Sequence, residues 1–68
     1  MMPLSFIHYM CEEAQRYLRE AKGKDVPLNE LLALPHWQKV WYFWKAKEHF
    51  EGYVPGMTAE ECKTIYGN

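Results

Sequence analysis

The stretch HWQKVWYFWKAKEHF, residues 36–50, carries six of the eleven aromatic residues of this 68-residue chain. Each aromatic side chain can bury about 150–250 Å² of surface, so the placement of these six rings decides how the chain folds. The stretch shows no strand-like alternation, and it lies between Pro35 and Gly52, which are typical of a helix start and a helix end. We therefore predict a long helix over about residues 35–51.

Viewed down this helix at about 100° per residue, the rings fall into three groups. One stripe about 60° wide holds all the tryptophans: Trp37, Trp41 and Trp44. Phe43 and Phe50 form a second patch about 120° away, and Tyr42 lies apart from both. We expect the tryptophan stripe to pack against the apolar side of the helix over residues 4–22. The phenylalanine patch then needs a second neighbour, which is either a short helix of the same chain or a second protein.

The first part of the chain predicts an amphipathic helix over residues 4–22, with Gly23 at its C-terminal end. Its apolar side chains share one arc of about 160°: Phe6, Tyr17, Met10, Ala21, Ala14, Ile7, Leu18, Cys11 and Leu4. The remainder of the helix is polar apart from Tyr9 and therefore faces water. We expect the whole arc to be the buried side of this helix.

Two short helices are predicted from local signals. Three leucines at helical spacing follow Asp25 and indicate a helix over about residues 27–33, with Asp25 as its N-cap. Thr58 and Glu61 have the spacing of a capping box and indicate a helix over about residues 58–66. The predicted fold class is therefore all-α: one small helical domain over residues 1–68, with two long amphipathic helices and two short ones.

A chain of this length has little stability to spare. It buries only about 60% of its unfolded surface, and a single core of this size supplies about 3–5 kcal/mol. Such a domain needs very good helix packing, a disulfide, a metal or a partner subunit. The formal net charge of −1 and the pI of about 6.3 favour association over repulsion between copies.

The same near-neutral charge argues against a general nucleic-acid binder, which carries a marked basic excess. Lysines interleaved with rings in residues 36–50 keep a small helical nucleic-acid-binding regulator as the alternative function. No basic segment precedes an apolar leader, and no apolar run approaches the roughly 18 residues that cross a membrane. We expect a cytoplasmic protein without membrane contact.

Chemistry-bearing residues form no recognised catalytic or metal-binding motif. Cys11 and Cys62 are too far apart in sequence for a CxxC pair, so free, reduced thiols are the expectation, with a disulfide between them as the alternative. His8 lies three residues before Cys11 and four before Glu12, so it neighbours both on a helix. A packed cysteine beside a solvated histidine explains that spacing. We predict no enzyme activity, no cofactor and no metal.

The function that remains is protein binding. We predict a small interaction module that regulates, inhibits or helps to assemble a larger protein, and that also self-associates as a homodimer. Small accessory proteins encoded by viruses are often of this size. Aromatic side chains are enriched among residues that dominate binding, and a lysine can lay its stem on apolar surface. The predicted partner-binding residues are Tyr42, Phe43, Lys47, Phe50 and Tyr9.

Overall fold

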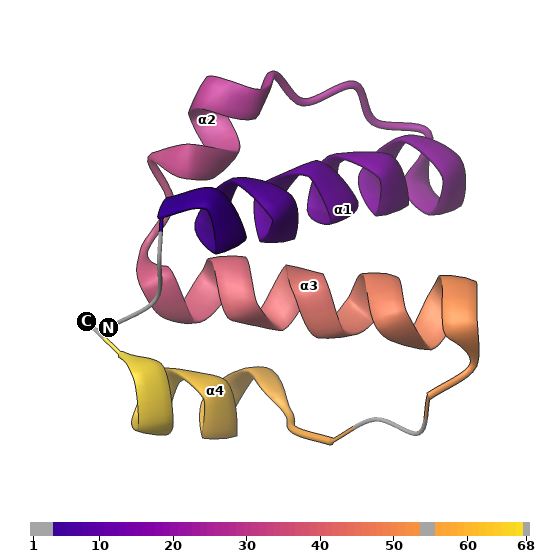
Figure 1. The fold of residues 1–68 in the computed structure, drawn as a ribbon. Helices are drawn as coiled ribbons and strands as arrows, with labels where there is room; N and C mark the ends of the chain where they lie inside the picture. The colour runs from indigo at the N-terminus through magenta and orange to yellow at the C-terminus, as the bar shows by residue number, and fades with distance from the viewer. Residues whose placement is uncertain (1–3, 54–55, 68) are drawn as a thin grey trace.

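The computed structural model describes residues 4–53 and 56–67, and these contain four helices and no strand (Figure 1). The long helices are α1 (Leu4–Lys22) and α3 (His36–Glu51), and the short ones are α2 (Leu28–Leu32) and α4 (Ala59–Tyr66). The predicted all-α fold with two long and two short helices is therefore confirmed. None of the helices in these ranges is both long and apolar enough to cross a membrane.

Residues at the helix ends account for most of the boundaries. Gly23 and Gly52 have φ angles of 66° and 72°, in the left-handed region that glycine adopts without strain. The N–H of Gly52 donates to the carbonyl of Glu48 at 3.1 Å and so ends α3. Thr58 and Glu61 form the predicted capping box at the start of α4. The N-cap assigned to Asp25 is wrong, because α2 begins only after Pro27 and has no side-chain cap.

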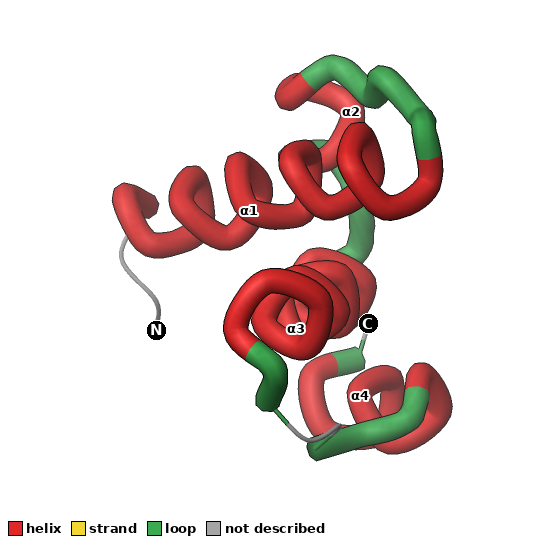
Figure 2. Tube along the Cα trace, turned by 90° about the vertical axis from the view of Figure 1, so that its right-hand side faces the viewer, coloured by secondary structure: helices red, strands yellow, loops and turns green. Residues whose placement is uncertain are grey.

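Helix α3 is the centre of the molecule. It contacts both α1 and α4, and α2 packs on α1. Figure 2, seen close to the axis of α3, shows α1 and α2 above this helix and α4 below it. All its side chains except those of His49 and Glu51 are buried or half-buried. A helix with neighbours on two sides needs apolar side chains on more than one face, which explains why its rings are spread around the helix.

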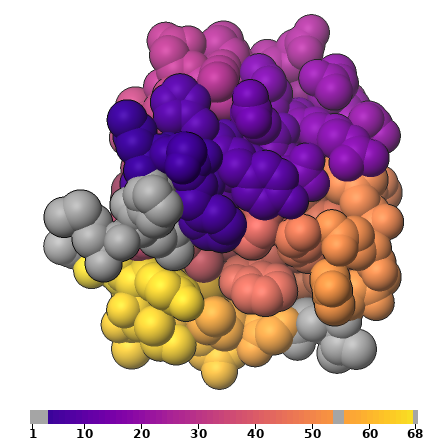
Figure 3. Space-filling model, in the orientation of Figure 1, coloured from indigo at the N-terminus to yellow at the C-terminus, as the bar shows by residue number. Residues whose placement is uncertain are grey.

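Two groups of buried side chains hold these helices together. The first joins α1, α3 and α4 and consists of Met10, Val40, Phe43 and Cys62. The second joins α1 to α2 and consists of Cys11, Ala14, Leu18 and Leu31. Tyr42 of α3 is half-buried against the second group. Across the face shown in Figure 3, side chains of α1 lie directly on those of α3.

The tryptophan stripe is not the most buried side of α3. The buried residues of α3 are Val40, Phe43 and Ala46. They follow one another at three-residue spacing, so Phe43 lies at the centre of the buried side of the helix. The three tryptophans are half-buried and pack around the first group, which α4 completes with Cys62. The prediction gave most weight to the largest rings, whereas a small side chain such as Ala46 lets a neighbouring helix approach closely.

The apolar arc of α1 is also only partly buried. Its centre is covered, with Ala14 at 1% and Leu18 at 7% exposure. Its two edges are not: Leu4 is 70% exposed and Phe6 is 38% exposed. An arc of about 160° is wider than the contact that α3 and α2 make with this helix.

The capping box gives a direct test of how α4 is held. Replacing Thr58 by alanine should lower the free energy of unfolding by about 0.5–2 kcal/mol, because the N–H of Glu61 loses its acceptor. Urea denaturation followed by circular dichroism measures this change. The matched control is Thr64→Ala, since that exposed hydroxyl bonds only to the carbonyl of Glu60 in its own helix. The control should change stability by less than about 0.5 kcal/mol, and equal effects at the two positions would contradict the assignment.

Candidate functional site

Three aromatic rings from α1 and α3 meet where the first turns of α1 cross α3. Phe6 and Tyr9 of α1 have ring centroids 5.9 Å apart, and each lies edge-on to Phe43 of α3, at 5.9 and 5.7 Å. Such edge-to-face pairs stabilise more than their buried area alone. Lys47, one turn after Phe43, completes the cluster. We call Phe6, Tyr9, Phe43 and Lys47 the aromatic face.

Lys47 is held in place by two hydrogen bonds. Its Nζ donates to Oε2 of Glu51 at 2.8 Å and to the hydroxyl of Tyr9 at 3.4 Å. The ammonium also lies 5.2 Å from the ring centroid of Phe43, within the range of a cation–π contact. The hydrogen bond to Glu51 is the main reason that the pKa of Lys47 is above its ordinary value, while desolvation opposes it. The rim of the aromatic face therefore carries a fixed positive charge beside a negative one.

The members of the aromatic face differ in exposure. Phe43 is only 9% exposed, so it is a core residue of this chain rather than part of an open patch. Phe6 and Tyr9 are 38% and 40% exposed and lie over it. Phe43 was predicted as a binding anchor because the tryptophan stripe was expected to pack against α1, which left the phenylalanine patch to a short helix or a second protein. In the structure α1 itself covers Phe43, through Phe6 and Tyr9. The surface that a partner can reach is formed by Phe6, Tyr9 and Lys47.

Phe50 lies apart from this cluster. The guanidinium of Arg16 stacks over its ring at 3.7 Å from the centroid, and the ring of His49 meets it edge-on at 4.9 Å. Arg16 is itself held by Glu20 at 3.4 Å. The second ring of the predicted phenylalanine patch is therefore half-buried under a cation from α1.

Tyr42 lies in a different region again, against the second buried group. Its ring meets Trp41 edge-on at 5.3 Å and borders a hollow between α1, α2 and α3. Of the five residues predicted to bind a partner, Tyr9, Phe43 and Lys47 come together, whereas Phe50 and Tyr42 do not join them. The role of all five residues in binding a partner stays a prediction. The sequence analysis missed Phe6, although its spacing of three residues from Tyr9 places both rings on adjacent turns.

The two cysteines offer no reactive site. Both are free, with Cys11 1% and Cys62 0% exposed, and they belong to different buried groups. Burial raises the pKa of both thiols; a nearby Lys39 partly offsets this at Cys11, and the charge of Glu61 adds to it at Cys62. The alternative of a disulfide between them is not what the structure shows. Within residues 4–53 and 56–67, no cluster of histidine, cysteine and acidic residues could hold a metal ion.

Comparison with protein-family models, curated protein sequences and solved structures finds no significant match.

If Cys11 and Cys62 are free and buried, as the structure has them, their thiols should be alkylated slowly in the folded chain. Because the thiolate is the reactive form and both thiols are buried with raised pKa values, iodoacetamide should modify Cys11 and Cys62 at least about tenfold more slowly in buffer than in urea. A Thr64→Cys variant provides the control, since position 64 is exposed on α4. Mass spectrometry should show one fast modification in that variant, and a fast reaction of either native thiol would contradict the assignment.

Proposed function

We propose that this chain is a protein-interaction module that self-associates through the aromatic face, and that it regulates, inhibits or helps to assemble a larger protein. The single observation that carries the proposal is the pair of exposed rings at the start of α1. Phe6 and Tyr9 are two of the five large apolar residues that are exposed among the described residues, and both rest on the buried ring of Phe43.

The geometry of these rings favours binding because they are already ordered. Each ring is fixed by edge-on contacts, and the hydroxyl of Tyr9 accepts a hydrogen bond from Lys47. A side chain that is held in one position before binding loses less conformational entropy on association. Aromatic residues with a polar rim are also the usual composition of the residues that dominate an interface.

Self-association is supported by the charges at the rim. Lys47 and Glu51 lie side by side at 2.8 Å on consecutive turns of α3. In a twofold dimer the same patch faces itself, so the lysine of one copy can meet the glutamate of the other. The net charge of −1 gives little repulsion between copies. We place the module in the cytoplasm, because two unpaired cysteines suit a reducing compartment.

Sedimentation of the purified chain over a range of concentrations tests this proposal. The wild type should shift from monomer to dimer with rising concentration, and its melting temperature should rise in parallel. Phe6→Ser and Tyr9→Ser should each weaken dimerisation by about tenfold or more, because each removes an exposed ring from the centre of the interface.

The matched control is Ile65→Ser, which removes an even more exposed apolar side chain, at 63%, from α4. This variant should dimerise like the wild type. Circular dichroism should show helical structure in all three variants. A wild-type chain that stays monomeric at millimolar concentration, or equal weakening by Ile65→Ser, would contradict self-association through the aromatic face.

A further inference from the structure

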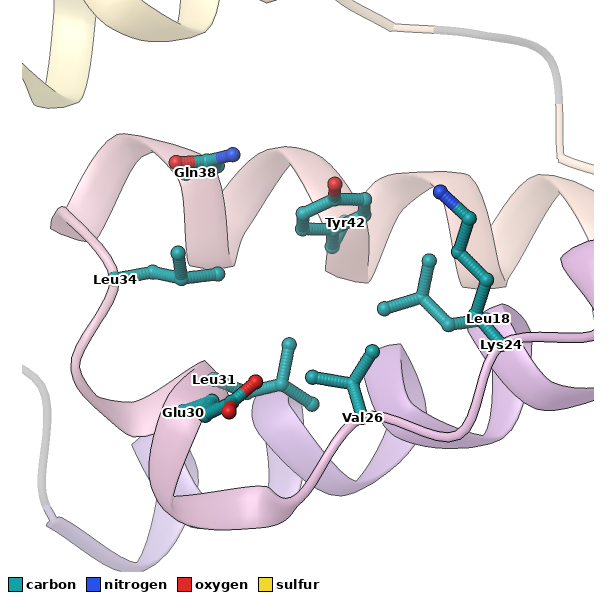
Figure 4. Close-up of a pocket in the computed structure, with 8 residues that line it drawn as sticks. All are labelled: Leu18, Lys24, Val26, Glu30, Leu31, Leu34, Gln38 and Tyr42. Atoms are coloured by element: carbon teal, nitrogen blue, oxygen red, sulfur yellow. The ribbon is translucent and has the colours of Figure 1, made fainter.

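A second surface lies between α1, α2 and α3, and it shares no residue with the aromatic face. It begins with a hollow of about 200 Å³. Figure 4 shows Leu18, Val26 and Leu31 pointing toward a common space below Tyr42, with Leu34 closing one end. Sites for drug-sized ligands measure about 300–1,000 Å³, so this hollow taken alone has room for one apolar side chain and not for a whole organic ligand.

The hollow continues into a larger one of about 420 Å³ along α1 and α3. The two share Leu18, Lys24 and Tyr42, so they form one groove. The second part adds the rings of Tyr17 and Trp41 together with two further lysines. We call this continuous surface the seam groove.

Charge distinguishes the seam groove from the rest of the chain. Three lysines line it, Lys22, Lys24 and Lys45, against one acidic residue, Glu30. The chain as a whole has eight basic and nine acidic residues, so the lining of the groove is more positive than the chain average. Lys45 is 3.6 Å from Glu48, while Lys22 and Lys24 form no ion pair with any residue in the described ranges. Two ammonium groups are therefore available to an anionic partner.

Two polar side chains at the rim are also available. Gln38 and Tyr42 border the first hollow, and Figure 4 shows the Tyr42 hydroxyl at the outer end of its ring, away from Leu31 and Val26. Within residues 4–53 and 56–67 neither side chain has a hydrogen-bond partner. An amide and a hydroxyl can donate to and accept from a peptide backbone. The groove thus combines an apolar pocket, two side chains that can hydrogen-bond to the backbone of a bound peptide, and positively charged lysines.

We propose that the seam groove binds a short acidic peptide segment of a partner protein. One leucine-type side chain of the segment enters the hollow over Leu18 and Leu31, and neighbouring carboxylates lie against Lys22 and Lys24. This inference deepens the proposed interaction module, since it names the chemical class of the partner. It does not depend on self-association, because the residues involved are different.

A single-stranded nucleic acid fits this groove less well. Base stacking needs an open ring face, whereas Trp41 already meets Tyr42 edge-on at 5.3 Å and lies under the ammonium of Lys45, also at 5.3 Å. The leucine-lined hollow contributes nothing to binding a phosphate backbone. An acidic peptide with an apolar anchor uses both the hollow and the lysines of the groove.

Fluorescence anisotropy with the full chain tests the proposal. The probe is a dye-labelled peptide with one central leucine flanked on both sides by aspartate and glutamate. Binding should be saturable at low salt, with the weak affinity of a small transient interface, and should weaken as sodium chloride rises from about 50 to 500 mM. Replacing the leucine of the peptide by glycine, or the acidic residues by lysine, should weaken binding by at least about tenfold.

Variants of the chain locate the site. The double variant Lys22→Glu/Lys24→Glu should weaken binding by about tenfold or more, and Val26→Phe should do the same by filling the hollow. Lys63→Glu is the control for one Lys→Glu replacement: it makes half the charge change of the double variant, on α4 and outside the groove, and should leave the affinity within about twofold.

Three binding results would each overturn the proposal: no saturable binding of the peptide at low salt, unchanged peptide affinity in Lys22→Glu/Lys24→Glu, or tighter binding of a labelled single-stranded oligonucleotide through the same lysines. A dimer whose formation is lost in Val26→Phe would show a second copy of the chain in the groove and would also overturn it. A failure in this assay leaves the sedimentation result for Phe6→Ser and Tyr9→Ser unaffected, so the two proposals can be judged separately.

Discussion

The ring of Phe43 is buried at the point where α1 crosses α3, and it shares its buried group with Met10 of α1 and Cys62 of α4. Helix α4 does not depend on Phe43 for its local structure, because Thr58 and Glu61 at its own N-terminus form its capping box. Its docking does depend on this group, since Cys62 is its single fully buried side chain. One buried group, with Phe43 as its aromatic member, therefore links both neighbours of the central helix.

Both proposed binding surfaces follow from this arrangement. The aromatic face exists because Phe43 supports Phe6 and Tyr9 from below, which keeps two exposed rings in fixed positions. The seam groove lies along the other flank of α1, where Leu18 and Leu31 belong to the second buried group. A small domain with two separate cores can thus present an aromatic patch and a basic groove without sharing residues between them.

Most helix ends could be predicted from the sequence, whereas the face of α3 that would be most buried could not. Gly52 and the pair Thr58 and Glu61 act within a few residues, so the helix ends they mark were predicted. Helix α3 has apolar side chains on nearly all sides, so its pattern did not show that Phe43 rather than the tryptophans would be most buried. The contact between Lys47 and Tyr9 joins residues 38 positions apart, and only the crossing of α1 over α3 creates it.

The most direct test of this account is the free energy of unfolding of Phe43→Ala, measured by urea denaturation of the monomeric chain at low concentration. Removing a buried phenylalanine lowers the free energy of unfolding by about 3–5 kcal/mol. This is as large as the whole free energy of unfolding expected for a domain of this size. We predict that the variant shows no cooperative transition, whereas Tyr53→Ala, which removes a 55% exposed ring, stays folded. A loss below about 1 kcal/mol in Phe43→Ala would contradict the central place of this ring.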